Sequence, residues 1–180
     1  ELSLREMVEQ LEDGQLDGAI GIKPFPKDGF YEASLFEEEF VLYVSHDHPL
    51  SQSQEVNWSD IPLEELILQE DMKQYFLEQK NQLIHPRRLG SNLSFRNGSL
   101  ETLRKIIDRN GGITLLPQLA CLYMGDRRRK MIRHIQNPTL SRTVSFFAPR
   151  GFEKNRISKV IQKEIRNSIP QVLCPLHSNI

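Results

Sequence analysis

Hydrophobic positions along the chain switch repeatedly between helical and strand-like spacing, and the clearest switch lies within residues 99–117. Ser99 can cap a helix there, because its side chain can accept a hydrogen bond from a backbone N–H of the first turn. After two glycines, an apolar run that ends at Pro117 predicts a short buried strand. The apolar stripe of the helix itself consists of Leu100, Leu103, Ile106 and Ile107.

The same two patterns extend along the rest of the chain and favour an α/β architecture with a largely parallel sheet. Strands are expected at residues 1–5, 16–22, 30–45, 66–68, 92–96, 113–117, 131–135 and 143–148. Helices are expected at residues 7–13, 58–65, 72–79, 99–108 and 153–168. The last helix carries one apolar face, formed by Ile157, Val160, Ile161 and Ile165.

Two of the expected connections are too short. The strand at residues 1–5 leads almost directly into a helix, although a crossover to a parallel neighbour takes about a dozen or more residues. The strand at residues 66–68 likewise passes into a helix without a loop. We therefore expect residues to be missing from this sequence near Glu6 and between Glu70 and Asp71.

Composition and charge restrict the class of protein. The chain has 180 residues, of which 38% are hydrophobic and 26% charged, as in a globular protein of one domain or two small lobes. Its formal net charge of −1 is unfavourable for binding nucleic acid on its own. No segment has the ~20 apolar residues of a membrane span and no signal peptide is recognisable, so we expect a cytoplasmic protein without a membrane partner. Cys121 and Cys174 lack the spacing of metal ligands, so neither a disulfide framework, a metal site nor another cofactor is expected.

Four segments occur in an order that resembles one family. They are Leu-Glu-Asp-Gly-Gln-Leu-Asp at 11–17, Leu-Phe-Glu-Glu-Glu-Phe-Val-Leu-Tyr-Val at 35–44 with His-Pro-Leu at 48–50, Ser-Leu-Glu-Thr-Leu-Arg at 99–104, and Gly-Ile-Thr-Leu-Leu-Pro at 112–117. In this order they resemble the effector-binding domain of LysR-type transcriptional regulators, over residues 1–168. The last two segments are most similar to the peroxide-sensing members of that family.

The resemblance implies a two-lobed, type 2 periplasmic-binding-protein-like fold, the LysR substrate-binding domain. Lobe I would combine residues 1–30 with 144–180, and lobe II would span residues 31–143. The winged helix-turn-helix domain that binds promoter DNA in this family would precede residue 1 and is absent from this chain. The implied partners are promoter DNA through that domain, RNA polymerase, and further copies of the chain in a homodimer or homotetramer.

The sensing site of such a domain would lie in the cleft between the lobes, with Ser99, Thr114, Arg142 and Thr143 as candidate residues. The resemblance implies that Arg142 stabilises the thiolate of a sensing cysteine. The residue type of Arg142 alone is equally consistent with a surface arginine that is paired with a carboxylate. Ser99 could help to bind an anion at the helix amino end, or it could serve only as a cap.

The sensing cysteine is the main departure from the family pattern. Peroxide-sensing members carry a Gly-His-Cys element and a second, resolving cysteine where this sequence passes from Glu70 to Asp71. Cys121 lies in an apolar run, as expected of an inert core thiol. Two interpretations remain open. Either the redox loop is missing between Glu70 and Asp71, which we favour, or the domain binds a small-molecule effector in the cleft.

Other classes are less well supported. A periplasmic solute-binding protein would share the fold but should carry a signal sequence. An enzyme is not expected, because the sequence has no nucleophile elbow, phosphate-binding glycine loop or metal-ligand cluster. Residues 127–130, a basic run, predict a solvated loop, and residues 37–39 a solvated acidic strand edge. His46, Asp47 and His48 could suggest a metal site or a general base, but neighbouring residues in a strand point to opposite faces, and His48-Pro49 resembles the hinge turn of the family.

The expected dimer interface involves the helix at residues 99–108 and the strand at residues 131–135. Its candidate residues are Leu103 and Ile107 on the helix and Ile132 on the strand. A charged residue at Leu103 or Ile107 is therefore expected to break the dimer.

Overall fold

The chain folds into two compact units, which are described separately below. The structure, a computed structural model, describes residues 2–23, 28–78, 94–95, 99–152 and 156–170. Unit 1 combines residues 1–38 with 141–180, and unit 2 comprises residues 39–140. Residues 31–38 and 141–143, which we had expected in the second lobe, therefore belong to unit 1. The reason is visible in the packing, because Leu35 and Phe36 lie in the core of unit 1.

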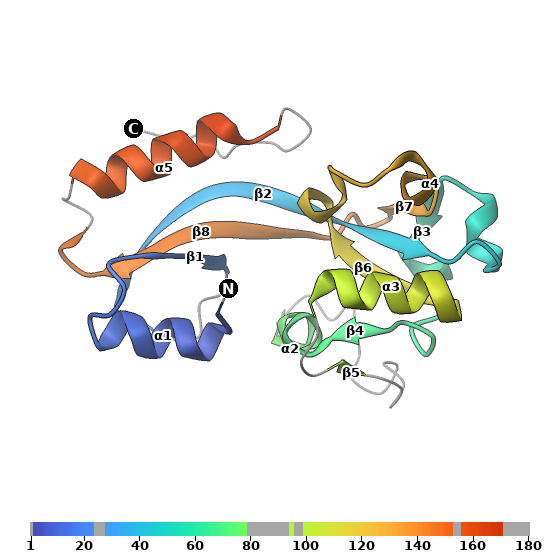
Figure 1. Ribbon diagram of the computed structural model, residues 1–180, viewed down its shortest axis with the longest axis horizontal. Helices are drawn as coiled ribbons and strands as arrows, with labels where there is room; N and C mark the ends of the chain where they lie inside the picture. Colours follow the sequence, from blue (N-terminus) through green and yellow to red (C-terminus); the bar gives the residue numbers. More distant parts are fainter. Residues whose placement is uncertain (1, 24–27, 79–93, 96–98, 153–155, 171–180) are drawn as a thin grey trace. The chain divides into compact units, whose positions relative to one another are not determined.

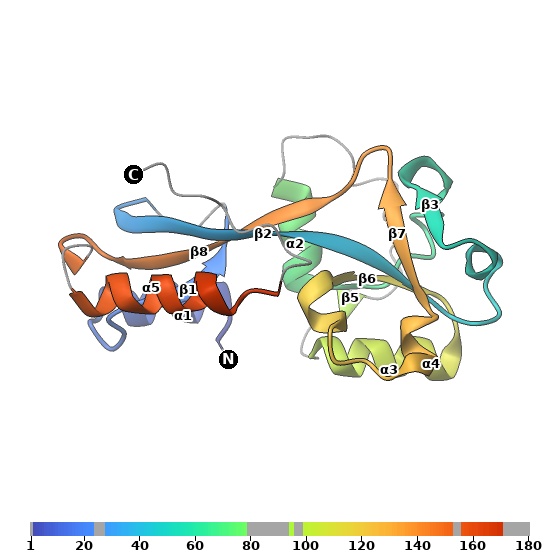
Figure 2. The ribbon, with the colours of Figure 1, turned by 90° about the horizontal axis from the view of Figure 1, so that it is seen from above.

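The sheet of unit 1 has the strand order β1 (Ala19–Ile22), β8 (Ser141–Pro149) and the first part of β2 (Phe30–Val44). β1 and β8 are antiparallel, and β8 and β2 run side by side (Figure 2). Two helices, α1 (Leu4–Glu12) and α5 (Arg156–Ser168), lie on opposite sides of this layer (Figure 1). These strands confirm the predictions for residues 16–22, 30–45 and 143–148.

The core of unit 1 lies between the sheet and α5. Its buried side chains are contacted by Ile165 of α5. On the opposite side, Gly21 of β1 lets α1 approach closely, because a Cβ at Gly21 would lie 3.4 Å from the sulfur of Met7. The buried residues of this core are Leu35, Phe36, Val144, Phe146 and Ala148.

Unit 2 is built around the second part of β2, which pairs antiparallel with β6 (Ile113–Pro117) and β7 (Ile132–Gln136). β3 (Glu55–Asn57) pairs parallel with β7, and β4 (Leu68–Gln69) pairs parallel with β5 (Ser94–Phe95). Its helices are α2 (Glu70–Glu78), α3 (Leu100–Asn110) and α4 (Asp126–Arg129), with 3-10 turns η1 (Pro49–Gln52), η2 (Trp58–Asp60) and η3 (Gln118–Cys121).

The core of unit 2 joins β2, β6 and α3. Tyr43 and Ile107 are both 0% exposed and pack in one cluster with Val41 and Leu116. Phe40 packs against α2, and its ring centroid lies 5.0 Å from that of Phe76 with the two rings tilted. The long apolar run of β2 is therefore buried by helices and strands of its own unit.

The start of the chain corrects the sequence analysis. Residues 1–5 were expected as a strand, but α1 begins at Leu4. Ser3 caps it, with its hydroxyl accepting from the Glu6 N–H at 3.3 Å, while the Glu6 carboxylate accepts from the Ser3 N–H at 2.8 Å. This reciprocal capping box starts one helix at the position where a strand was expected. Because there is no strand, no crossover connection is needed, and the reason for expecting missing residues near Glu6 no longer holds.

Two further expectations are wrong. The sheet is mixed rather than largely parallel, because β2 pairs antiparallel with both β6 and β7, as does β1 with β8. The helix expected at residues 58–65 is only a 3-10 turn, in which Asn57 makes no side-chain cap. Within the described residues, no helix is both long and apolar enough to cross a membrane.

Candidate functional site

The amino end of α3 is capped as predicted. The Ser99 hydroxyl accepts a hydrogen bond from the Thr102 N–H at 3.3 Å and lies 3.2 Å from the Thr102 hydroxyl. The side chain is therefore already engaged by its own helix. This geometry matches the interpretation of Ser99 as a cap, and its part in an effector site stays a prediction.

The apolar stripe of α3 corrects the expected dimer interface. Leu103 and Ile107 are both 0% exposed within a single chain. Ile107 belongs to the core of unit 2, and Ile132 is a partly buried neighbour of the same cluster. A side chain that its own fold covers completely has no surface to offer a partner, so Leu103 and Ile107 are core residues.

Thr114 lies in the middle of β6 and is also 0% exposed. It stands opposite Tyr43 in the β2–β6 ladder. Its hydroxyl donates to the carbonyl of Leu115 at 3.4 Å, a long contact. The structure thus places Thr114 inside unit 2.

A polar cluster that the sequence analysis missed surrounds Tyr43. The Tyr43 hydroxyl donates to the Asp108 carboxylate at 2.5 Å and lies 3.2 Å from the sulfur of Met131. The other Asp108 oxygen accepts from Arg128 at 3.0 Å. Burial, followed by the bond to Asp108, raises the pKa of Tyr43 far above its ordinary value. The phenol therefore stays protonated and links β2 to α3, while Asp108 links α3 to α4.

Arg142 lies on β8 in unit 1 and is paired with a buried carboxylate. Its Nε and one terminal nitrogen lie 2.9 and 2.8 Å from the same oxygen of Glu38. The Glu38 side chain is 1% exposed and that of Arg142 is 22% exposed. The neighbouring Thr143 accepts a hydrogen bond from the Lys23 N–H through its backbone carbonyl, at 3.0 Å. The geometry of Arg142 therefore agrees with the alternative in which this arginine is paired with a carboxylate.

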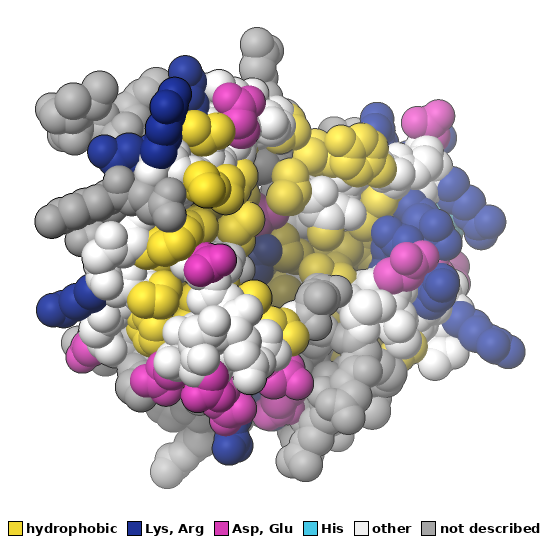
Figure 3. Space-filling model, turned by 60° about the vertical axis from the view of Figure 1, so that its left-hand side comes forward, with side chains coloured by type: hydrophobic (Ala, Val, Ile, Leu, Met, Phe, Trp, Pro, Cys, Tyr) yellow, Lys and Arg dark blue, Asp and Glu magenta, His cyan; other side chains and the backbone are white. Residues whose placement is uncertain are grey.

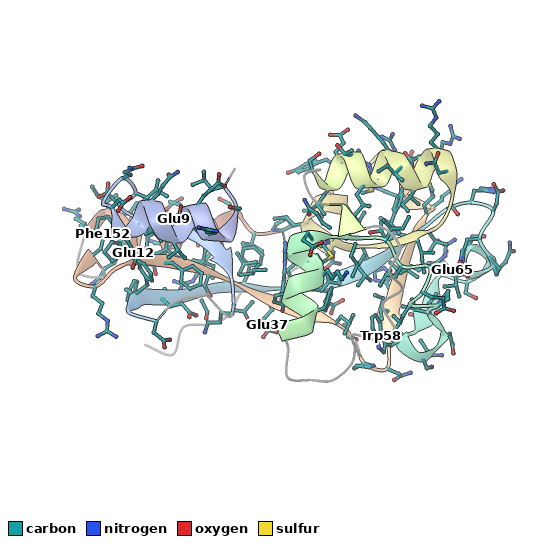
Figure 4. The ribbon with its side chains drawn as sticks, turned by 90° about the horizontal axis from the view of Figure 1, so that it is seen from below. Glu9, Glu12, Glu37, Trp58, Glu65 and Phe152 are labelled. Carbon is teal, nitrogen blue, oxygen red and sulfur yellow. The ribbon has the colours of Figure 1, made fainter. Side chains whose placement is uncertain are left out.

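Glu38 corrects the expectation of a solvated acidic edge at residues 37–39. Glu37, labelled in Figure 4, and Glu39 are exposed, whereas Glu38 is buried. Side chains in a strand alternate between faces. The buried Phe36 and Phe40 on either side, two residues away, were the sequence signal for this burial.

The four candidate residues therefore divide between the two units. Arg142 and Thr143 belong to unit 1, and Ser99 and Thr114 belong to unit 2. Their assembly into one effector site remains a prediction.

The junction at Glu70 is the place where a redox loop was expected. Here β4 ends at Gln69, and α2 begins at Glu70 and continues through Asp71. Among the residues that the structure describes, neither the buried Oε2 of Glu70 nor the buried Nε of Arg104 on α3 has a hydrogen-bond partner. Buried polar atoms without partners mark places where a ligand, water or further chain can bind. The missing loop itself stays a prediction.

Cys121 follows β6 and is buried. Its thiol lies 3.7 Å from the carbonyl oxygen of Pro117, within reach of a weak hydrogen bond. These contacts agree with the expected core thiol. Cys174 lies outside the described residues.

The basic run forms helix α4 rather than the expected loop. Arg128 is held by Asp108, and Arg129 donates to the Leu122 carbonyl at 2.9 Å. The residues that could suggest a metal site are also separately engaged. Nε2 of His48 lies 3.1 Å from Glu65, which Figure 4 labels, and its Nδ1 accepts from the Leu50 N–H. In the part of the chain that the structure describes, no three His, Cys, Asp or Glu residues are grouped as a metal would require.

The curated proteins that resemble this chain are named as regulators of gene expression. The Haemophilus influenzae protein named hydrogen peroxide-inducible genes activator is 30% identical over 161 residues, covering 89% of this chain and 53% of that protein. The Escherichia coli K12 DNA-binding transcriptional dual regulator OxyR is 32% identical over 120 residues, covering 67% of this chain and 39% of that protein. The chain thus spans about half the length, or less, of these curated relatives.

Solved structures show the same fold. The crystal structure of OxyR from Porphyromonas gingivalis matches with a TM-score of 0.80 at 20% identity, over 99% of this chain and 81% of that chain. A crystal structure of the reduced form of OxyR matches with a TM-score of 0.73 at 27% identity, over 91% and 76%. These matches confirm the predicted fold class. Because residues 1–163 match the LysR substrate binding domain, the chain belongs to the family of LysR substrate-binding domains.

Proposed function

We propose that this chain is the regulatory domain of an OxyR-like transcription regulator that responds to hydrogen peroxide. One observation carries the proposal: the similarity to the Haemophilus influenzae hydrogen peroxide-inducible genes activator extends over 89% of the chain. It therefore includes both units and the junction at Glu70. The Escherichia coli relative, which is named a DNA-binding regulator, supports the same function.

DNA binding and assembly are activities of the longer protein of which this chain would be the regulatory domain. In this proposal a separate DNA-binding domain contacts promoter DNA, and the regulatory domains hold copies of the protein together in a dimer or tetramer. The regulator acts in the cytoplasm, together with RNA polymerase. The domain itself catalyses no reaction. Its role is to convert a chemical signal into a change between two arrangements of the attached domains.

Peroxide chemistry in such a domain requires a thiolate. Hydrogen peroxide transfers one oxygen to the thiolate, giving a sulfenic acid and hydroxide, and a second thiol then forms the disulfide with release of water. We place the reactive thiol in a loop between Glu70 and Asp71. There it would precede residues 71–78 of α2, and the amino-terminal dipole of that helix favours a thiolate. The cysteines within the 180 residues themselves are Cys121 and Cys174.

The test is the intact mass of the purified protein, with thiols counted before and after dilute hydrogen peroxide. The proposal predicts a mass above the 20.9 kDa of this sequence and two peroxide-sensitive thiols in addition to Cys121 and Cys174. Replacement of Cys121 by serine is the control and should leave the response unchanged.

A junction without added residues, together with no peroxide-sensitive thiol, would contradict the thiol switch. Promoter binding by the longer protein is then measured with and without peroxide. Promoter binding that peroxide does not change would mean that a small-molecule effector regulates the domain.

A further inference from the structure

Positive charge is concentrated in one segment of unit 2. Residues 99–133 contain eight Lys and Arg but only three Asp and Glu, although the formal net charge of the whole chain is −1. Figure 3 shows Lys and Arg side chains gathered on the right of its view. The rest of the chain is therefore acidic on balance, and the surface of this segment differs from it in sign.

Two carboxylates of α3 neutralise only part of that charge. Asp108 lies 3.0 Å from Arg128. Glu101 lies 3.3 Å from Arg104 and 3.5 Å from Lys105. Both acidic side chains are thus already engaged by cations of the same segment.

Three other cations of the segment are exposed. They are Arg109 in the last turn of α3, Arg127 in α4 and Lys130, which directly follows α4. Within the described residues, none of the three forms an ion pair. We call Arg109, Arg127 and Lys130 the basic patch.

The basic patch draws on two neighbouring helices. Arg128, which follows Arg127, donates to the carboxylate of Asp108, which precedes Arg109, at 3.0 Å. This hydrogen bond holds the carboxyl-terminal part of α3 beside α4 (Figure 2). Tyr123, shortly before α4 in the chain, is 96% exposed and adds an aromatic ring with a hydroxyl group.

We propose that the basic patch binds the phosphate backbone of the DNA that the intact regulator occupies. The inference rests on the proposed function, in which a separate domain holds promoter DNA, and adds a sequence-independent contact from the regulatory domain. Arginine suits this contact, because its planar guanidinium can donate to two phosphate oxygens at once. The Tyr123 hydroxyl is a further donor of the kind that contacts phosphates.

The chemistry of the surface favours DNA over an acidic protein. The centre of a protein–protein interface is depleted of charged residues, whereas protein–DNA interfaces are polar and strongly positive. Cations that displace the counterions of DNA also gain free energy from the release of those ions. A chain of net charge −1 does not bind DNA tightly by itself, so the contact depends on a linked domain that keeps the DNA at high local concentration.

The test measures how salt affects DNA binding by the intact regulator. The probe is a long duplex of mixed sequence, because phosphate contacts do not depend on base sequence. In the variant Arg109→Gln/Arg127→Gln/Lys130→Gln, the slope of log K against log salt concentration should become less steep by about 2–3, since each lost phosphate contact reduces it by about 1. Affinity at low salt should fall about tenfold or more.

A matched control removes the same three charges from unit 1. The variant Arg150→Gln/Arg156→Gln/Lys159→Gln changes exposed side chains there and should keep the wild-type slope. Photocrosslinking gives a direct readout of contact. With benzoylphenylalanine in place of Tyr123 we expect a crosslink to the DNA, and with the same residue in place of Lys159 we expect none.

The inference requires both the reduced slope and the crosslink to DNA. If wild-type regulator binds the duplex but either result is missing, the inference is overturned and the proposed function stands. A crosslink from position 123 to another polypeptide in place of DNA would likewise overturn it, because the surface would then bind protein. Failure of the wild-type regulator to bind any duplex DNA would overturn the proposed function and this inference together.

Discussion

Truncation of Leu103 on α3 distinguishes a core residue from an interface residue. Its side chain is 0% exposed within one chain. Leu103→Ala removes three buried carbon atoms and leaves a cavity, which costs about 3 kcal/mol at such sites. For a protein of this size we expect the melting temperature to fall by roughly 6–12 °C. Thermal unfolding monitored by circular dichroism measures this change, and sedimentation of the folded variant should show the same oligomer as the wild type.

The matched control is Lys105→Ala on the same helix. The Lys105 side chain is 65% exposed and pairs only loosely with Glu101, at 3.5 Å. Its removal should change the free energy of unfolding by no more than about 0.5 kcal/mol. The assignment of Leu103 to the core would be refuted if Leu103→Ala kept the wild-type melting temperature and instead shifted the sedimentation profile toward a smaller species.

Three further predictions follow from the polar contacts. Tyr43→Phe, which removes the bond to Asp108, should lower the free energy of unfolding by about 1–2 kcal/mol. Because the folded pKa of Tyr43 is raised, its contribution is fully present below about pH 10 and is lost as the pH rises further. Wild-type stability in urea should therefore fall more steeply above pH 10 than that of Tyr43→Phe, and equal slopes would contradict the burial. Arg142→Met removes the cation that is paired with the buried Glu38 and should cost about 3 kcal/mol in urea unfolding, with partial recovery in the double variant Arg142→Met/Glu38→Gln; no recovery would exclude coupling. Ser99→Ala should cost about 1 kcal/mol, and Ser99→Asp should restore most of it if the cap alone matters.

Local patterns predicted the parts of the fold that local chemistry determines. The α3 helix with its Ser99 cap and the β2 strand matched the structure closely, because capping and a long apolar run are sequence-local signals. The prediction for the start of the chain was wrong for a related reason. Five residues cannot separate a strand period from a helical one, and the decisive signal was the pair of Ser3 and Glu6, three positions apart.

The polar contacts of the candidate site could not be read in the same way. Arg142 and Glu38 are 104 positions apart, and Tyr43 and Asp108 are 65 positions apart. Residue types indicated that Arg142 would need an anion, but only the folded sheet shows which carboxylate supplies it. Glu38 was partly accessible to inference, because its place two residues from Phe36 puts it on the buried face of the strand.

The α5 helix shows what an amphipathic pattern does and does not determine. The periodicity grouped Ile157, Val160, Ile161 and Ile165 on one face. In the structure the first three are exposed, whereas Ile165 packs against the core of unit 1. In the structure the small polar Ser158 and Gln162 pack inward, where their mutual hydrogen bond satisfies them. A surface helix ordinarily turns its apolar stripe toward the core, and α5 departs from that rule at Ile157, Val160 and Ile161. The spacing of apolar residues therefore groups side chains on one face of a helix, whereas the direction of that face is set by the tertiary packing, as the described part of α5 shows.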